Sequence, residues 1–456
     1  MTLYSQTKLT PQQCQRARMS RDARFDGRFY IAVKSTGIFC RPICPATLPK
    51  EENVEYFAHQ AQALQAGYRP CLRCRPDSAP ASWAWKGTET TFQRAVSLID
   101  HGALQGKSLA DLAERLGISE RYLRQLFKTY LGMSPKQYAQ YQQLMFAKQL
   151  LHHSHLSVTD IGFACGFNST RRFNDAFQKC LRLTPSQVRR EPGSASATNT
   201  VSLAYRGPFD WQHMLAFYQL RAIDGIEQVQ ADRYQRHVML NGSRAWFAAR
   251  CASDTHMEIE FELESLRDLR YLVSIWRRVF DLNADMVAIE AQLAKAAPEL
   301  VIHPGLRIPG VWSPWEAGVR AVLGQQVSIK AAIGQLNLLV STLNHRQPRP
   351  WYFPDPQQVA SADLSFLRMP QSRKETLSRL AGFVQQNPHA AVDEWLALKG
   401  IGPWTVDYAR LRGQSDTNCF LSGDLIVKKA LALHPGLTAE RVAPWGSYAT
   451  FQCWNQ

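Results

Sequence analysis

The stretch Cys40-Arg-Pro-Ile-Cys44, followed after 26 residues by Cys71-Leu-Arg-Cys74, decides how the first part of the chain folds. Two close thiol pairs can complete a tetrahedral zinc site, and a block of fewer than about 80 residues often needs a structural metal ion to fold. The spacing therefore predicts one structural Zn²⁺ held by Cys40, Cys44, Cys71 and Cys74. Four buried cysteines without a metal are the alternative. A zinc-bound thiolate also stays nucleophilic at neutral pH, so this pattern is compatible with a reactive site as well.

Arginines crowd the two thiol pairs. Four thiolates on Zn²⁺ carry a net charge of −2, which repels DNA phosphates, and nearby guanidinium groups offset that repulsion. We therefore expect Arg41 and Arg73 to contact DNA, within a basic group completed by Arg69 and Arg75. The remaining cysteines are scattered, which favours a reducing compartment over a disulfide framework.

Length and charge point to several domains and an acidic polymer as partner. The chain has 456 residues and a formal charge of +15, and nearly all of the surplus lies in residues 1–190. Such a basic block suits nucleic acid. Apolar residues make up 45% and charged residues 20%, which excludes a disordered chain. The sequence has no run of 18 apolar residues and no apolar N-terminal core, so we expect no membrane partner and a cytoplasmic, nucleoid-associated protein.

Three blocks follow from composition and periodicity. Residues 1–78 hold the paired cysteines and short strand-like runs such as Phe29–Val33. Residues 85–190 are helical by period, and the small polar stretch 191–200 is typical of a linker. The last block, residues 201–456, begins with strand-like pieces at His237–Leu240 and Glu258–Leu263 and is helical from about Leu266 onward.

The middle block contains an internal repeat. Ser108–Ile118 matches Ser157–Phe167, and each copy predicts a short helix, a Gly turn, an N-cap (Ser119; Asn168 or Ser169) and a second helix. The pair, joined by a long helix at about Pro135–Leu151, resembles the AraC-type DNA-binding domain. The resemblance implies that each second helix enters a major groove. The side chains then available for DNA, unless they are merely solvated, are Arg121, Arg124, Lys128, Arg171, Arg172 and Asn174.

The first block resembles a known repair domain. Arg21–Phe29, Ala32–Cys44 and Arg69–Pro76 are similar to the N-terminal domain of the Ada family of adaptive-response proteins. The resemblance implies that Cys40 takes a methyl group from a DNA methylphosphotriester. Methylation would remove one negative charge, so affinity for DNA should rise and a repair event would become a signal.

The last block contains a hairpin of the helix-hairpin-helix form, Leu398-Lys-Gly-Ile-Gly-Pro-Trp-Thr405, followed by Phe420-Leu-Ser-Gly-Asp424. Together with Arg307–Gly310 and Gly318–Ser328, these segments resemble the helix-hairpin-helix DNA glycosylases, and the AlkA family by pattern. The resemblance implies a small mixed α/β domain followed by a helical domain. It also implies that Asp424 is the catalytic carboxylate, or else only an N-cap. Aromatic residues of the base pocket, with ordinary core as the alternative, would be Phe217, Trp404, Tyr408 and Trp454.

The predicted chemistry is excision of alkylated bases such as 3-methyladenine. An ionised Asp424 would stabilise the oxocarbenium-like sugar, and electron-rich rings would favour a cationic base. Relatives that also nick the backbone have a lysine where this chain has Trp404, so we expect a monofunctional glycosylase without a cofactor. DNA contacts are expected from Gly400, Gly402 and Thr405 in the hairpin, and Gln326 is expected to fill the vacated base stack.

The combined hypothesis is a multidomain protein with a zinc domain of α+β class (1–80), an all-α double helix-turn-helix domain (85–190), a linker (191–200), a mixed α/β domain (201–290) and a helical glycosylase domain (291–456). It would act on double-stranded DNA, combine methyl transfer to Cys40 with transcriptional activation and base excision, and bind RNA polymerase. The alternatives are a regulator whose last block only binds DNA, and a repair enzyme with a purely structural zinc.

Overall fold

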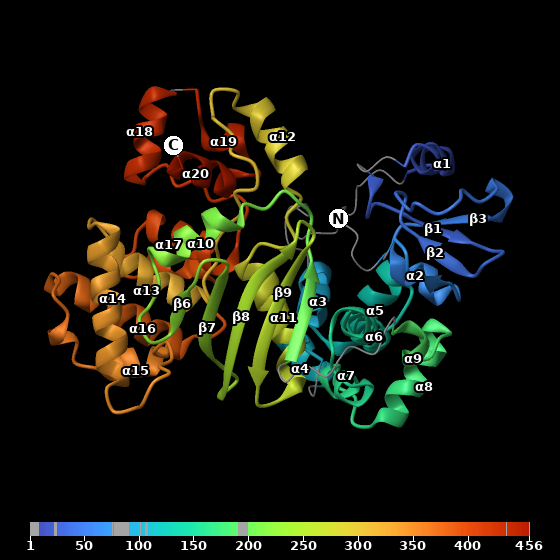
Figure 1. Cartoon of the computed structure of the whole chain (residues 1–456), viewed down its shortest axis with the longest axis horizontal. Coiled ribbons are helices and arrows are strands. Elements are labelled where there is room, and N and C mark those ends of the chain that lie inside the picture. Colours follow the sequence, from blue (N-terminus) through green and yellow to red (C-terminus); the bar gives the residue numbers. More distant parts are fainter. Residues whose placement is uncertain are drawn as a thin grey trace. The chain divides into compact units, whose positions relative to one another are not determined.

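The computed structural model describes residues 9–21, 25–74, 76, 91–100, 102–104, 108–189, 199–434 and 436–455. The chain divides into two compact units, residues 1–196 with 266–271 and residues 197–265 with 272–456 (Figure 1). The predicted multidomain fold is confirmed, whereas the finer domain boundaries stay predictions. Among the described helices, none combines the length and the apolarity that a membrane crossing requires.

The first unit opens with a small four-stranded sheet in the order β3-β1-β2-β4. Strand β1 pairs antiparallel with β2 and β3, and β2 pairs in parallel with β4. This topology places the ends of β2 and β4 side by side, so that the two cysteine pairs that follow them meet. The elements are α1 (Pro11–Met19), β1 (Tyr30–Val33), β2 (Ile38–Cys40), η2 (Glu51–Asn53), β3 (Val54–Phe57), α2 (Gln60–Gln65) and β4 (Arg69–Pro70).

The rest of the first unit is helical, and the repeat in the sequence is a repeat in the structure. Ser108 and Ser157 cap the first helix of each copy, and Ser119 and Ser169 cap the second, each accepting a backbone N–H. Ser169, not Asn168, is therefore the second cap. The helices are α3 (Thr91–Asp100), α4 (Leu109–Arg115), α5 (Glu120–Leu131), α6 (Pro135–His153), α7 (Val158–Ala164), α8 (Thr170–Leu181) and α9 (Pro185–Val188).

The second unit begins with an antiparallel sheet in the order β5-β9-β8-β7-β6. Burial alternates along β7 and β9, as expected of strands with one covered face. The predicted linker residues 199 and 200 belong to β5, and residues 191–198 lie outside the described part of the chain. The elements are β5 (Asn199–Ala204), α10 (Trp211–Gln219), β6 (Glu227–Val229), β7 (Arg233–Leu240), β8 (Ser243–Ser253) and β9 (His256–Leu263). The short helix η5 (Leu266–Asp268), which follows β9 in the chain, belongs to the first unit.

A helical bundle completes the second unit. Trp276 on α11 packs edge-on against Phe247 of the sheet, and a separate apolar cluster around Trp315 and Trp395 forms the core of the bundle. Helix α17 runs into a π-helical turn, η8 (Arg410–Gln414). The other elements are α11 (Leu269–Val279), α12 (Met286–Ala296), α13 (Pro314–Gly324), α14 (Ile329–Asn344), α15 (Pro356–Ser361), η6 (Leu364–Phe366), α16 (Gln371–Gln386), η7 (Val392–Ala397), α17 (Pro403–Ala409), α18 (Leu425–Leu433), α19 (Ala439–Val442) and α20 (Gly446–Trp454).

Candidate functional site

The four predicted zinc ligands lie together. The sulfur atoms of Cys40, Cys44, Cys71 and Cys74 are all within 4.8 Å of one another. Zn–S bonds of about 2.3 Å at tetrahedral angles place sulfurs about 3.8 Å apart, so the donor set fits one Zn²⁺. The backbone N–H of Cys71 donates to the carbonyl of Phe39 at 2.9 Å, which fixes the second thiol pair beside the end of β2.

Cys40 differs from the other three cysteines in its exposure. Cys44, Cys71 and Cys74 are buried, whereas Cys40, the last residue of β2, is only half-buried. Among the four ligands, Cys40 is therefore the residue with the largest solvent-exposed fraction. Arg73 is exposed between the last two ligands and is available to a phosphate, and Arg75 lies outside the described residues.

Arg41 does not have the role that the sequence suggested. Its side chain is buried and forms a two-pronged ion pair with Asp26, in which Nε donates to Oδ1 at 2.8 Å. Its Nη1 donates to the carbonyl of Cys74 at 3.2 Å, and its backbone N–H donates to the Cys74 sulfur at 3.3 Å. The prediction that Arg41 contacts DNA is therefore wrong for this structure, because Asp26 holds the guanidinium inside. A hydrogen bond from a backbone N–H to a cysteine sulfur orients that sulfur and favours its thiolate form.

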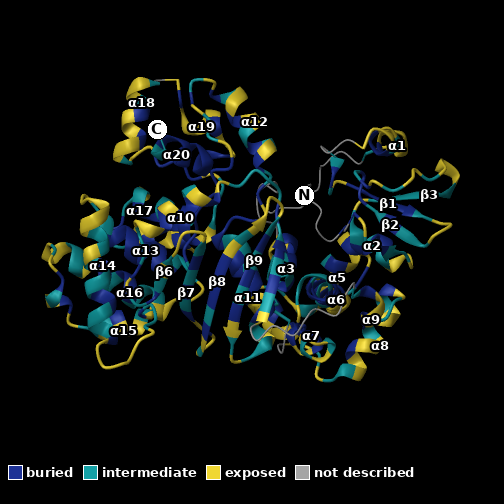
Figure 2. Ribbon diagram, in the orientation of Figure 1, coloured by how far each residue is buried: buried dark blue, intermediate teal, exposed yellow. Residues whose placement is uncertain are grey.

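The second helix of each repeat presents a polar face. Buried residues, among them Leu123 and Phe127 in α5 and Phe173 and Phe177 in α8, alternate with exposed ones along both helices (Figure 2). One of these, Arg124, also pairs with Glu120 one turn earlier on the same exposed face. The exposed side chains include every predicted contact in these helices, namely Arg121, Arg124, Lys128, Arg171, Arg172 and Asn174.

Four aromatic rings of the second unit form two pairs, and one ring of each pair lies against the segment that carries Asp424. Trp404 and Tyr408 of α17 stack with ring centroids 5.4 Å apart, and Phe217 of α10 lies 6.4 Å from Trp454 of α20 with an interplanar angle of 17°. Trp454 Nε1 donates to Asp424 Oδ1 at 3.0 Å, so the carboxylate holds the last of these rings. The structure thus brings together residues from segments nearly 240 positions apart.

Asp424 is both a helix cap and part of this aromatic cluster. Its Oδ1 accepts the backbone N–H of Ile426 at 2.9 Å and that of Val427 at 3.3 Å, in addition to the bond from Trp454. Three N–H donors and the N-terminus of α18 stabilise the ionised carboxylate. No described residue donates to Oδ2, so this oxygen can face a sugar cation or a water molecule. A Cβ added at Gly423 would lie 3.9 Å from Trp404 Cδ1, which places the loop carrying Asp424 against α17.

The hairpin before α17 needs its first glycine for its shape. Gly400 has φ +93°, and a Cβ there would lie 2.0 Å from Thr376 Oγ1, whereas Gly402 has space around it. Thr405 is buried, its hydroxyl accepts from Gln325 Nε2 at 3.2 Å, and its N–H donates to the carbonyl of Gly402. The prediction that Thr405 contacts DNA is therefore not supported by this structure, because its side chain is buried against Gln325.

Gln326 lies at an exposed corner between α13 and α14. Its φ is +55°, a conformation that a residue with a side chain rarely adopts. Strain of this kind, about 1–3 kcal/mol, tends to occur at functional sites. Beside it, Val327 and Ile329 are exposed apolar side chains, 41% and 46% accessible. A strained, exposed corner is what a residue that enters a base stack would occupy.

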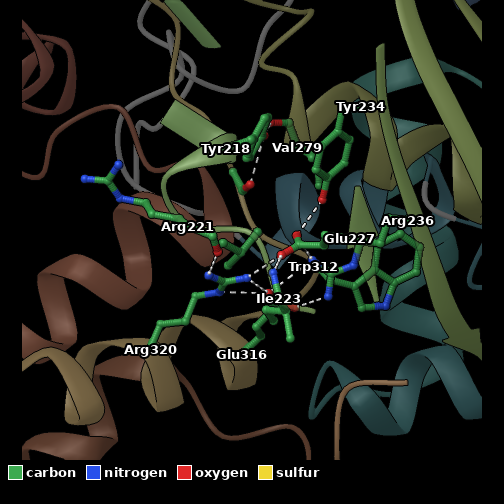
Figure 3. Close-up of polar contacts among 12 residues, drawn as sticks. Tyr218, Arg221, Ile223, Glu227, Tyr234, Arg236, Val279, Trp312, Glu316 and Arg320 are labelled. Atoms are coloured by element: carbon green, nitrogen blue, oxygen red, sulfur yellow. Dashed lines mark hydrogen bonds and ion pairs between the residues drawn. The ribbon is translucent and has the colours of Figure 1, made fainter. Parts of the chain in front are cut away.

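A buried ionic network, which no sequence pattern predicted, joins the sheet to α13. Glu227 and Glu316 each bind both Arg236 and Arg320, and all four side chains are at most 6% exposed (Figure 3). Burial alone would raise the pKa of Glu316, but the two guanidinium groups outweigh it and lower that pKa. Two charges of each sign balance, which is what a buried network needs.

Two further arginines lie against the pocket rings, and the sequence analysis missed both. The guanidinium carbon of Arg221 is 3.6 Å from the centroid of Phe217, and that of Arg412 is 4.7 Å from the same centroid. Arg320 fixes the first of them, because its Nη1 donates to the carbonyl of Arg221 at 2.9 Å, while the Arg221 side chain points away from the network (Figure 3). The position of Arg221, one helical turn after Phe217, was the available signal.

Known proteins that resemble this chain cover both of its units. Family models match for the metal-binding domain of Ada over residues 13–77, a helix-turn-helix domain over 112–191 and the AlkA N-terminal domain over 200–313. A probable bifunctional transcriptional activator/DNA repair enzyme AlkA of Mycobacterium tuberculosis is 34% identical across 97% of this chain and 96% of its own length. The chain belongs to this AlkA-type bifunctional family.

Two other relatives each match only one part of the present chain. DNA-3-methyladenine glycosylase 2 of Escherichia coli is 32% identical over 56% of this chain and 96% of its own length. The bifunctional transcriptional activator/DNA repair enzyme Ada of Escherichia coli is 34% identical over 40% of this chain and 50% of its own length. The family therefore joins a DNA-binding activator and repair part of Ada type to a DNA glycosylase part, with a four-cysteine site that fits Zn²⁺.

Proposed function

We propose that Cys40 accepts a methyl group from a DNA methylphosphotriester and that the methylated protein then activates transcription with RNA polymerase. We also propose that the second unit is a monofunctional glycosylase for 3-methyladenine and related bases, with Asp424 as its catalytic carboxylate. The observation that carries the first part is the partial exposure of Cys40 among three buried ligands. The observation that supports the last part is the hydrogen bond from Trp454 Nε1 to Asp424 Oδ1, which joins a carboxylate to the aromatic cluster.

In the transfer step, the Cys40 sulfur forms a bond to the methyl carbon while the bond from that carbon to the phosphotriester oxygen breaks. The phosphodiester leaves as an anion, and the sulfur changes from a thiolate to a neutral thioether. A bound Zn²⁺ keeps the sulfur ionised at neutral pH. Exposed Arg73 would approach the DNA backbone, and the backbone N–H of Arg41 donates to the Cys74 sulfur at 3.3 Å.

Mass spectrometry after exposure to methylated DNA tests this step. The wild-type chain should gain the mass of one methylene group on Cys40, and Cys40→Ser should gain nothing. Cys251→Ser is the matched control, because Cys251 is also half-buried but lies in β8, and it should still be methylated on Cys40. An adduct on another cysteine, or none in wild type, would contradict the proposal and favour a purely structural zinc.

In the excision step, the pocket receives a base rotated out of the duplex, and Gln326 fills the gap. As the glycosidic bond breaks, the free oxygen of Asp424 stabilises the cationic sugar. Trp404, at the position where a lysine would form a Schiff base, has no amine to offer, which supports hydrolysis without strand cleavage. Exposed Leu425 and Ile426, beside Asp424, extend the surface that would meet the DNA.

Release of 3-methyladenine from alkylated duplex DNA tests this step. Asp424→Asn should lower the single-turnover rate by about 10²–10³, because the N-cap remains but the charge is lost. Asp355→Asn is the matched control, since Asp355 caps α15 in the same way, and it should keep the wild-type rate. No release by wild type would favour a regulator whose second unit only binds DNA.

A further inference from the structure

We propose that Gln325 is a positioning residue, which fixes the corner that carries Gln326 to the hairpin of residues 398–405. The inference rests on the proposed glycosylase function and deepens it, because it assigns a residue to the extrusion of the base rather than to the breaking of the glycosidic bond. Through the amide of Gln325, the hairpin that binds the DNA backbone holds the corner that enters the base stack.

The side-chain amide of Gln325 bonds two groups at the hairpin. Its Nε2 donates to the carbonyl of Gly400 at 3.1 Å and to the hydroxyl of Thr405 at 3.2 Å. Gly400 lies in the turn of the hairpin, whereas Thr405 lies in the first turn of α17. An amide nitrogen carries two hydrogens, and these two acceptors use both of them. The amide of Gln325 therefore ties the end of α13 to the turn and to the helix that follows it.

The hairpin is itself fixed from another side by α16. The carbonyl of Lys399 accepts from Arg379 Nη1 at 3.1 Å and from Thr376 Oγ1 at 3.4 Å. Thr376 also closes the space beside Gly400, so the turn has little room to shift. Gln325 is thus bonded to a support that does not move easily.

The corner between α13 and α14, in contrast, has little packing of its own. Every residue from Gln326 to Ala331 is exposed, and Gln326 has φ +55°. Helix α13 ends just before Gln325, whose backbone N–H donates to the carbonyl of Val322 at 3.4 Å. A strained conformation persists only where its surroundings fix it. Burial does not fix this corner, and the bonds of Gln325 to the hairpin lie directly before the strained residue.

Extrusion of a base requires two contacts with DNA that do not move relative to each other. One contact holds the backbone while the other enters the space that the base leaves, and the binding energy of the first offsets the cost of unstacking. If the corner could recoil from the hairpin, this energy would be lost in displacing the protein. A displacement of about 1 Å far from the reacting atoms can lower a rate by about 10². The amide of Gln325 opposes that recoil.

A purely structural role for Gln325 is the alternative. Under that role, loss of the amide loosens the second unit and slows base release by the same factor whichever residue occupies position 326. Under the proposed role, loss of the amide matters only while a side chain at position 326 can enter the stack. The two roles therefore differ in a double-mutant cycle.

Single-turnover release of 3-methyladenine from alkylated duplex DNA by the full chain provides this cycle. Gln325→Met keeps the length of the side chain and removes both donors, so it should slow release about tenfold. In the Gln326→Ala background, which is itself slow, the same change should have no further effect. Thr405→Val removes one acceptor and keeps the shape of the side chain, so it should slow release about threefold and remain folded even if Gln325→Met does not.

Gln335→Met is the matched control. The side chain of Gln335 in α14 also bonds another segment, because its Oε1 accepts the backbone N–H of Arg368 at 2.6 Å, and this variant should keep the wild-type rate. Equal losses from Gln325→Met in the wild-type and Gln326→Ala backgrounds would assign Gln325 a structural role and overturn the inference. Unchanged rates in Gln325→Met, or a Gln326→Ala variant as fast as wild type, would overturn it and leave the proposed function intact. No release by wild type would refute the glycosylase function and the inference with it.

Discussion

The hairpin glycines provide a matched pair of substitutions. At Gly400, an alanine would have to adopt φ +93° and place its Cβ 2.0 Å from Thr376 Oγ1 and 3.0 Å from Thr376 Cβ. Thr376 cannot move easily, because it is buried in α16 and its hydroxyl donates to the carbonyl of Ser372 at 2.9 Å. At Gly402, an added Cβ would meet nothing within 4 Å, and φ is −108°.

The two costs at Gly400 add because they are of different kinds. The left-handed backbone costs a residue with a Cβ about 1–2 kcal/mol, and forcing atoms into a packed site costs about 1–3 kcal/mol. We therefore expect Gly400→Ala to lose about 2–5 kcal/mol of unfolding free energy. At Gly402, the loss of a good N-cap residue and the gain of about 0.4–1 kcal/mol from a stiffer unfolded chain nearly cancel, so Gly402→Ala should change little.

Urea unfolding followed by tryptophan emission measures the difference, since every tryptophan except Trp83 and Trp85 lies in the second unit. A double-mutant cycle separates the two costs. In the Gly400→Ala background, Thr376→Ala should recover about 1–3 kcal/mol relative to additivity, because the clash is removed while the backbone cost remains. If Gly400→Ala were no less stable than Gly402→Ala, the argument from hairpin geometry would be refuted.

Three further expectations follow from the site and its surroundings. Cys44→Ser, or chelation of the metal in wild type, should abolish stoichiometric zinc binding and the ordered zinc domain while base release persists, which metal analysis and limited proteolysis would check. Burial raises the pKa of Asp281 from 3.8 to about 6. Between these two pH values the folded chain holds a proton that the unfolded chain has lost. The contribution of Asp281 to the free energy of unfolding is therefore complete below about pH 4, and about 3 kcal/mol of it is lost as the pH rises through 6. Asp281→Asn should remove that slope in urea midpoints measured at several pH values. Gln326→Gly should stabilise the fold by about 1 kcal/mol by relieving positive φ, yet slow base release, and a variant that is both more stable and equally fast would contradict the role of Gln326.

The zinc site and the paired helix-turn-helix could be predicted because their signals are local. Ligand chemistry limits what two close thiol pairs can do, and apolar residues at helical spacing fix which faces of α5 and α8 are free. The fate of Arg41 could not be predicted in this way. Asp26 lies fifteen positions earlier, and only the folded sheet brings its carboxylate beneath Arg41.

The aromatic residues of this cluster were expected from the resemblance, whereas the two arginines that contact them, Arg221 and Arg412, were not predicted. Arg412 reaches Phe217 and Tyr408 from a π-helical turn, where the period of 3.6 residues that governs sequence patterns no longer holds. Thr405 was expected to contact DNA because it belongs to the hairpin motif. The motif alone does not reveal that this side of α17 packs on Gln325.

The network of Glu227, Arg236, Glu316 and Arg320 limits where this protein can be truncated. It crosses the border drawn at residue 290 from the sequence, since two of its members lie in the sheet portion and two in α13. A shortened chain that starts at residue 291 would leave Glu316 and Arg320 paired only with each other, without Arg236 and Glu227. The smallest autonomous excision module therefore has to retain the sheet, even though the pocket aromatics lie almost entirely outside it.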